Sequence, residues 1–134
     1  MPLFDDFLIS EDSLRVYDGD RLIFKSSKDG LQPLLEYIDV FTPYPGKIRI
    51  FDKIMGNAAA LLSVKAGCQE VYSPLGSELA TRTLGSYHIE YHFAEVVPYI
   101  QRRNQQGMCP MEKLSISKSP EEFYQVLKQH TKPI

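Results

Sequence analysis

The spacing of hydrophobic positions changes several times along the chain, and each change predicts a new element. Apolar residues alternate with polar ones on both sides of Asp18-Gly19, whose backbone freedom suits a tight turn, so residues 13–26 are predicted to form a β-hairpin. Apolar residues then recur at helical spacing over residues 31–38, and the Pro43-Tyr44-Pro45 segment ends that pattern. These residues predict a hairpin followed by a helix.

A short strand and a buried helix are expected next. Residues 48–50 predict the strand, and Asp52 is a favourable N-cap for a helix over residues 53–66 that Gly67 ends. This helix has little polar surface, so we expect it to lie against a sheet. Gly56 falls inside it, where glycine costs about 1 kcal/mol relative to alanine. Its presence there implies the close approach of a ligand or of another backbone.

Two further strands are predicted at residues 69–72 and 89–93, the second from its alternating apolar side chains. Between them, Ser73-Pro74 has the sequence of an N-cap and a first helical residue, so a helix is expected from there to Gly85. After the hairpin, the sequence thus predicts three helices and three strands in alternation.

Helical segments are predicted for the C-terminal part. They are a turn over residues 98–103, a helix start at Cys109-Pro110-Met111-Glu112 and an appended helix over residues 120–130. The complete order predicts one domain over residues 1–134, with a three-layer α/β/α architecture and a mixed sheet. Ligands of such folds gather at the carboxyl ends of strands and at helix N-termini.

Charge and composition argue against two classes of binding partner. The 134 residues contain 15 Lys and Arg against 17 Asp and Glu, so no positive excess favours nucleic acid or an anionic membrane. The longest uncharged stretch, Ile54 to Val64, is shorter than the roughly 20 residues of a membrane-spanning helix. The acidic start lacks the features of a secretory signal, so a cytoplasmic location is expected. Cys68 and Cys109 are then expected to be free thiols.

The sequence argues against a metal site. His88-Ile89-Glu90 together with Cys109-Pro110-Met111-Glu112 superficially resembles the zinc-deaminase pattern. That pattern needs its His and Glu at a helix N-terminus and two thiolates, whereas this triplet lies in a predicted strand and only one thiol follows. His88 and His92 share a strand face, but no third ligand is evident. We therefore expect no metal and no other cofactor.

Cys109 is the candidate nucleophile. A thiol at a helix N-terminus feels the positive end of the helix dipole, which favours the thiolate, while Glu112 would oppose it by repulsion. Lys53 or a histidine would be its activator. The alternative is that Cys109 only caps its helix. Cys68, at a helix end, is expected to be a packing residue.

Lys53 and Asp52 are candidates for binding an anion at the mouth of the buried helix. A phosphate or carboxylate there would meet backbone N–H groups and the Lys53 ammonium, and Ser77 and Glu78 would reach the same crevice. The alternative is that Lys53 pairs with an acidic neighbour and only keeps the helix end solvated. Both interpretations remain open from the sequence.

Four motifs occur together in one order and spacing: Asp52-Lys53-Ile54-Met55-Gly56-Asn57-Ala58-Ala59-Ala60-Leu61, Ser77-Glu78-Leu79-Ala80, Val97-Pro98-Tyr99-Ile100 and Cys109-Pro110-Met111-Glu112. Over residues 12–114 the chain resembles the small prokaryotic family called domain of unknown function 1893. The resemblance implies a cytidine-deaminase-like fold. In that fold the zinc ligands lie at the N-termini of two successive helices, where this chain has Asp52-Lys53 and residues 73–78. It implies no reaction.

The leading hypothesis is a cytoplasmic module that lacks the zinc ligands of a deaminase and binds a small anionic or nucleotide-like ligand at helix N-termini. Its predicted binding residues are Asp52, Lys53, Gly56, Ser77, Glu78 and Glu112. One alternative is a thiol-dependent enzyme using Cys109. Another is a non-catalytic scaffold that forms a homo-oligomer through its tyrosine-rich surface. Whether the chain is an enzyme stays open, but zinc-dependent deamination is not expected.

Overall fold

A five-stranded mixed sheet forms the centre of the computed structural model, which describes residues 2–101 and 107–131. Its strands are β1 (Leu14–Asp18), β2 (Arg21–Ser26), β3 (Ile48–Asp52), β4 (Cys68–Ser77) and β5 (Glu90–Val97). The helices are α1 (Pro2–Ile9), α2 (Gln32–Phe41), α3 (Asn57–Ala66), α4 (Glu78–Ser86), α5 (Pro110–Ser115) and α6 (Pro120–Thr131). An α/β fold with an N-terminal β-hairpin is therefore confirmed.

The sheet has the strand order β2-β1-β3-β4-β5. Strand β1 is antiparallel to both β2 and β3, whereas β3, β4 and β5 run parallel. Gly19, with φ of 63°, provides the left-handed backbone at the hairpin turn. Because β3–α3–β4–α4–β5 is a repeated parallel crossover, the N-termini of α3 and α4 follow the carboxyl ends of β3 and β4.

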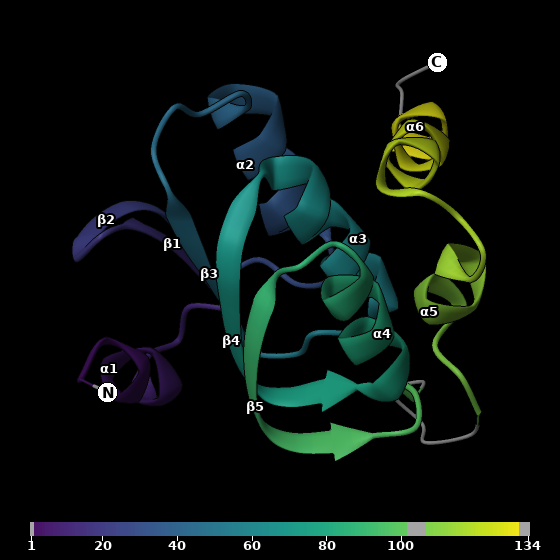
Figure 1. Cartoon of the computed structure of the whole chain (residues 1–134), viewed down its shortest axis with the longest axis horizontal. Helices are drawn as coiled ribbons and strands as arrows, with labels where there is room; N and C mark the ends of the chain where they lie inside the picture. The colour runs from purple at the N-terminus through teal and green to yellow at the C-terminus, as the bar shows by residue number, and fades with distance from the viewer. Residues whose placement is uncertain (1, 102–106, 132–134) are drawn as a thin grey trace.

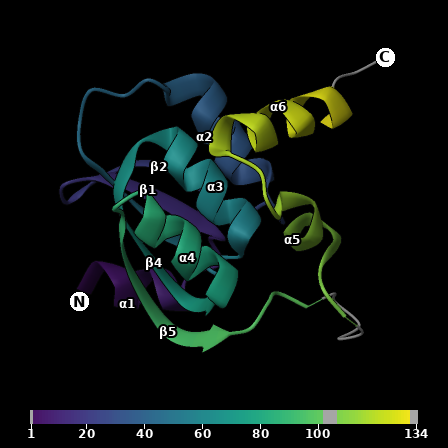
Figure 2. The same ribbon diagram turned by 45° about the vertical axis from the view of Figure 1, so that its right-hand side comes forward.

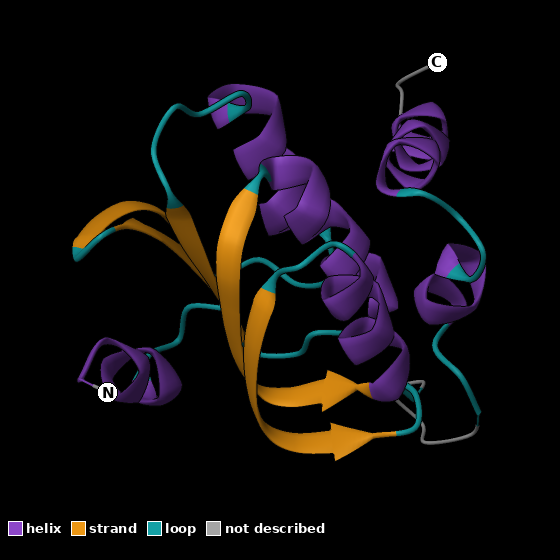
Figure 3. Ribbon diagram, viewed as in Figure 1, coloured by secondary structure: helices purple, strands orange, loops and turns teal. Residues whose placement is uncertain are grey.

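The helices cover the two faces of the sheet unequally. Figure 1 shows α2, α3 and α4 together on one face, with α1 alone on the other. Helices α5 and α6 form an outer row, and both contact α3 (Figure 2). In Figure 3 the same arrangement separates the strands from the main group of helices. Helix α3 is thus enclosed by the sheet on one side and by other helices on the other.

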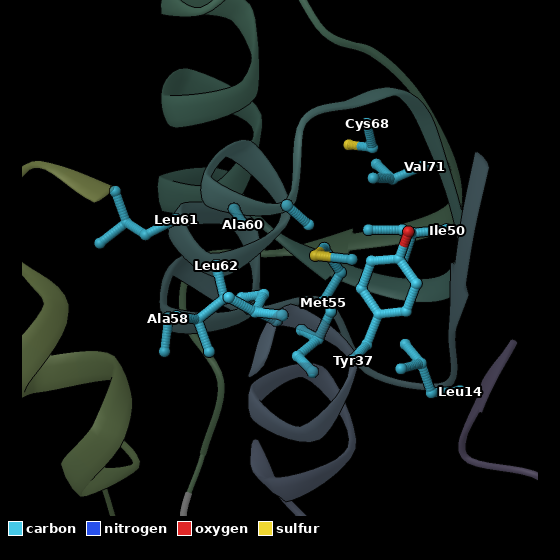
Figure 4. Close-up of a cluster of buried hydrophobic side chains, with 14 of the residues drawn as sticks. Leu14, Tyr37, Ile50, Met55, Ala58, Ala60, Leu61, Leu62, Cys68 and Val71 are labelled. Carbon is cyan, nitrogen blue, oxygen red and sulfur yellow. The ribbon is translucent and has the colours of Figure 1, made fainter. Parts of the chain in front are cut away.

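That enclosure explains the sequence of α3. Ala58, Ala59 and Ala60 are all buried, as are Leu61 and Leu62 that follow them. Small side chains allow the outer helices and the sheet to approach α3 closely, while the two leucines fill the space between (Figure 4). The prediction of a buried helix against the sheet is confirmed.

Helix α1, which was not predicted, covers the other face with aromatic side chains. Phe7 is fully buried and its ring lies 5.9 Å from that of Phe51, with Phe4 at 5.8 Å from the same ring. Tyr17 and Tyr72 complete this cluster. The helix was missed because its acidic residues and short length obscure a helical period.

The predicted start of the third helix was wrong. Ser73-Pro74 lies inside β4, and α4 begins after Ser77, whose hydroxyl caps it by accepting from Ala80 N at 3.0 Å. Strand β4 continues because β5 pairs with it as far as Ser77↔Val97. Pro74 is skipped in that pairing, so its missing N–H costs the ladder no hydrogen bond. The helix ends at Ser86, one residue past the predicted Gly85.

The predicted start of the buried helix was also wrong. Strand β3 runs through Asp52, and the N-cap of α3 is Gly56 rather than Asp52. Residues 53–56 are not helical because Met55 bridges to Gly76 of β4 in extended conformation. Gly56 therefore precedes α3 instead of lying within it.

Of the predicted turn over residues 98–103, residues 98–100 are not helical and Gln101 forms a bridge with Met108. Residues 102 and 103 lie outside the described part. The predicted helix starts at Cys109-Pro110 and Pro120 are confirmed. Within the described residues, no helix combines the length and the apolar composition needed to cross a membrane.

Candidate functional site

A pocket of about 490 Å³ opens where β3 ends and α3 begins. The loops α1–β1 and β2–α2 line one side of it, and the segment around α5 lines the other. The first turn of α3 forms its inner wall through Ala58 and Ala59. This is the position at which the topology predicts a ligand site, next to the carboxyl end of a parallel strand.

The structure brings five of the seven predicted site residues to this pocket: Asp52, Lys53, Gly56, Cys109 and Glu112. The other two lie elsewhere in the described structure. The Ser77 side chain is fully buried as the cap of α4, and Glu78 is exposed in the first turn of that helix. Ser77 and Glu78 were expected at the same crevice because the helix was expected to begin four residues earlier.

Glu112 occupies the N-terminus of α3. Its carboxylate is 2% exposed and accepts hydrogen bonds from Asn57 N at 2.5 Å and from Ile100 N at 2.8 Å. Asn57 is the first residue of α3, so a side chain of the protein already fills the place where an anion would bind this helix. Although Glu112 lies in the first turn of α5, the helix that it caps is therefore α3.

Gly56 is required by this arrangement. A Cβ atom at this position would lie 2.9 Å from Glu112 Oε1 and 2.8 Å from Ile100 Cγ1, closer than such contacts normally permit. The sequence predicted the close approach of a ligand or of another backbone, whereas the structure shows that of the Glu112 carboxylate and of the Ile100 side chain.

Asn57 connects three helices. Its amide nitrogen Nδ2 donates to Ser115 Oγ of α5 at 3.0 Å and to Ser115 O at 3.3 Å. Its Oδ1 accepts a short hydrogen bond from the Thr83 hydroxyl of α4. Asn57 is 6% exposed, and with these bonds the polar atoms of its side chain are satisfied. Asn57 lies within one of the sequence motifs, but no role could be predicted for it because its partners are distant in sequence.

Lys53 is held by backbone carbonyls. Its ammonium donates to Ser10 O at 2.9 Å and to Asp12 O at 2.8 Å, and it lies 4.6 Å from the centre of the Phe7 ring. These contacts fix the loop between α1 and β1 against the end of β3. The structural alternative for Lys53 gains support, although carbonyls of the chain replace the acidic partner that was expected.

Asp52 is the titratable group that the site perturbs most clearly. Its side chain is half-buried, and the surrounding protein raises the pKa of its carboxyl to about 7 because burial disfavours the charged form. Hydrogen bonds from the backbone N–H groups of Ile54 and Lys53 only partly offset this effect. The Asp52 carboxyl therefore changes charge close to neutral pH.

Cys109 is the N-cap residue of α5 and is half-buried. Its side chain makes no capping hydrogen bond, while its backbone N donates to Ile100 O at 2.7 Å. Cys68, in contrast, is buried, and burial raises the pKa of its thiol to about 12. Both cysteines are free thiols, as expected.

The proposed activators of Cys109 have other partners. The Lys53 ammonium donates to two carbonyls, and His92 lies between Glu70 and Glu90 on the sheet. His88 is exposed in the turn before β5, with φ of 60°, so it does not share a strand face with His92. These contacts offer no hydrogen-bonded base for the thiol.

Carboxylates dominate the charge of the pocket. The described lining includes five of them, from Glu11, Asp12, Asp29, Asp52 and Glu112, against the single ammonium of Lys53. Asp12 pairs with Arg15 at 2.7 Å, outside that lining. The acidic loop residues were missed by the sequence analysis because only the folded hairpin brings them next to the end of β3.

Comparisons with known proteins agree on one family. The model of the family described as "Domain of unknown function (DUF1893)" matches residues 5–131, a wider range than the 12–114 covered by the motifs. A crystal structure of a DUF1893 family protein from Thermotoga maritima has a TM-score of 0.87 and 28% sequence identity, covering 96% of this chain and 87% of that chain. No curated protein matches. The chain belongs to the DUF1893 family.

Proposed function

We propose that this protein binds a small polar molecule in the pocket at the start of α3, through a group that donates hydrogen bonds to Asp52. The observation that carries the proposal is the acidic lining of a pocket at the carboxyl end of β3. Its volume of about 490 Å³ lies within the range of small-molecule sites. An amino, amidine or ammonium group is the chemistry that complements a carboxylate.

The anionic ligand predicted from the sequence has less support. The Glu112 carboxylate occupies the N-terminus of α3, and the Lys53 ammonium already donates to two carbonyls. Neither this helix N-terminus nor Lys53 is therefore free to bind a phosphate. The five carboxylates of the lining would repel one. A nucleotide-like ligand remains part of the proposal in its nucleoside form, with an exocyclic amino group of the base facing Asp52.

A cytidine-deaminase-like fold belongs to the same proposal. It is supported by the successive units β3–α3 and β4–α4, whose helix N-termini are where the resemblance implies zinc ligands. In this chain Gly56-Asn57 and Ser77-Glu78 stand at those N-termini, and neither pair contains a histidine or a cysteine. We therefore propose binding without zinc-dependent deamination.

The test is a comparison of three probes by calorimetry at pH 8: cytidine, cytidine monophosphate and agmatine. Cytidine and its monophosphate differ only in the phosphate, while agmatine tests an aliphatic cation. We expect cytidine or agmatine to bind more tightly than the monophosphate, and Asp52→Asn to weaken that binding at least tenfold. Glu78→Gln is the matched control, because it removes an exposed carboxylate outside the pocket.

Mass spectrometry of the natively purified protein accompanies these titrations and identifies molecules retained from the cell. Tighter binding of the monophosphate would favour the anionic ligand instead. The absence of both a retained molecule and binding of any probe would contradict the proposal.

A thiol-dependent enzyme is the second candidate, because Cys109 lines the same pocket and its side chain makes no capping bond. A substrate bound through Asp52 would then lie near this thiol. The missing element is a hydrogen-bonded base among the described residues.

Self-association is the third candidate. Strand β5 is one of the two edge strands of the sheet, and Tyr91 and Val96 are 40% and 48% exposed on it. Long apolar edge strands are typical sites of strand pairing between chains. Light scattering coupled to gel filtration measures the mass of the particle, and a monomer at all concentrations would contradict this candidate.

The free thiols of Cys68 and Cys109 support the proposed cytoplasmic location.

A further inference from the structure

Three potential metal ligands converge on the face of the sheet that carries α1. Glu70 of β4 pairs with Glu90 of β5, and Tyr72 pairs with His92 two residues farther along. Because alternate residues of a strand share a face, these four side chains lie on one side of the sheet. The Tyr72 ring lies 5.7 Å from Phe4 of α1, which identifies that side (α1 is labelled in Figure 1).

The imidazole of His92 lies between the two carboxylates. Its Nε2 is 3.2 Å from Glu70 Oε2 and 3.3 Å from Glu90 Oε2, and all three atoms lie within 4.8 Å of one another. We propose that Glu70, Glu90 and His92 bind one divalent transition-metal ion of the zinc class, with water completing its coordination.

The spacing favours a metal over a simple ion pair. Ligand atoms bound at about 2.0–2.1 Å to a tetrahedral Zn²⁺ lie roughly 3.3–3.4 Å apart, close to the 3.2 Å and 3.3 Å between His92 Nε2 and the two carboxylate oxygens. Hydrogen bonds between a charged nitrogen donor and a carboxylate are usually about 2.7–2.9 Å long. A single Nε2–H shared between the two carboxylates would make only two long, weak hydrogen bonds, whereas one cation placed among the three atoms neutralises both carboxylates.

Neighbouring side chains hold the ligands in place. The ring of Tyr72 stacks on that of His92 with centroids 4.4 Å apart and an interplanar angle of 17°. The Tyr72 hydroxyl also donates to Glu70 Oε2 at 3.4 Å, and Arg49 Nε lies 4.0 Å from the other oxygen, Oε1. Arg49 thereby orients the Glu70 carboxylate with Oε2 directed toward His92. Such outer contacts are typical of sites that position metal ligands.

Access from solvent is open. The side chains of His92 and Glu90 are 43% and 68% exposed, while that of Glu70 is 14% exposed. No metal site was predicted from the sequence, because only His88, His92 and Cys109 were considered as ligands. The approach of Glu70 depends on the pairing of β4 with β5, which no local pattern reveals. None of the three proposed ligands lines the pocket at α3, so this site is independent of the proposed function.

In the experiment, the metal-free full chain is titrated with ZnCl₂ at pH 7.5. Calorimetry and competition with a chromogenic chelator measure the binding. We expect one Zn²⁺ per chain, and at least tenfold weaker binding for His92→Ala and for Glu70→Gln. His88→Asn is the matched control, because it removes an exposed histidine near the same strand and asparagine tolerates a positive φ. Cys109→Ser is a second control, because it removes the thiol of the zinc pattern that was rejected from the sequence. Both controls should bind Zn²⁺ with an affinity within about twofold of the wild type.

Urea unfolding of each metal-free variant establishes that it is folded, and the visible spectrum of bound Co²⁺ reports the coordination directly. We expect this spectrum in the wild type and in both controls but not in His92→Ala. The proposal is overturned if no Zn²⁺ binds up to about 1 mM, if His92→Ala binds as tightly as the wild type, or if Cys109→Ser abolishes binding.

Discussion

Replacing Glu112 by glutamine tests whether this pocket carboxylate is a structural cap or a ligand-binding group. In the structure both of its oxygens accept backbone hydrogen bonds, one from Asn57 N and one from Ile100 N. Glutamine has almost the same shape but only one acceptor oxygen. Its oxygen would still accept from one backbone N–H, but its NH₂ group would face the other, so that this N–H and the NH₂ group would both lack an acceptor.

The expected loss follows from two contributions. Losing one hydrogen bond to a charged group costs about 1.5–3 kcal/mol. Removing the negative charge from the N-terminus of α3 costs about 0.3–1 kcal/mol more. Relief from burying a charge acts in the opposite direction and sets the lower limit. We expect Glu112→Gln to lower the free energy of unfolding by about 2–3 kcal/mol, or the melting temperature by roughly 6–12 °C for a domain of this size.

Urea denaturation at pH 7 measures this change, with Glu78→Gln as the matched control. Glu78 is also in the first turn of a helix, but it is exposed, so its replacement should cost no more than about 1 kcal/mol. If Glu112→Gln is as stable as this control, the two hydrogen bonds contribute little. Glu112 would then be available for a ligand, and the structural interpretation would be refuted.

Three further predictions use other residues of the pocket. Lys53→Met should lower the free energy of unfolding by about 1–3 kcal/mol, because the Ser10 and Asp12 carbonyls lose their charged donor; unchanged urea denaturation would contradict this. Burial raises the pKa of Asp52 to about 7, above its unfolded value near 3.9, so the native state binds the extra proton and stability should fall as pH rises from about 4 to 7. Asp52→Asn should remove that decline in melting curves at pH 5 and pH 8, and a decline of the same size in the variant would refute the assignment. Cys109 should be alkylated by iodoacetamide at pH 7 faster than Cys68, whose burial raises its pKa to about 12, and equal rates by mass spectrometry would show that the pocket does not expose the Cys109 thiol.

Local patterns were sufficient for much of the fold. The Asp18-Gly19 turn, the helical period of residues 31–38 and the apolar α3 sequence each depend on contacts within a short segment or on simple burial. The errors occurred where distant pairing outweighs a local signal. Ser73-Pro74 has the local features of a helix start, but β5 extends β4 through them. No local pattern reveals where a parallel neighbour stops pairing.

In the candidate site, too, local sequence signals predicted some features, whereas contacts between distant segments could not be predicted. Cys109-Pro110 was correctly predicted to begin a helix, and Gly56 does have close neighbours, although they are side chains rather than the expected ligand or backbone. The identity of these neighbours was beyond the sequence, because Glu112 is 56 positions away and could equally have capped its own helix. The partners of Asn57, Ser115 and Thr83, are similarly remote. Their proximity follows from the packing of α4 and α5 around α3.

These contacts change what the family motifs mean for function. Residues 52–61 and 109–112 carry the resemblance to the DUF1893 family, and the structure joins them through the Glu112 carboxylate and the Asn57 backbone. At the N-terminus of α4, Ser77 plays the corresponding role through its hydroxyl. The N-termini of α3 and α4 are thus both capped by side chains of the chain itself. Under the proposed function, a ligand would be recognised by pocket groups that take no part in these caps. Asp52, with its charge changing near neutral pH at the wall of the pocket, is the strongest of them.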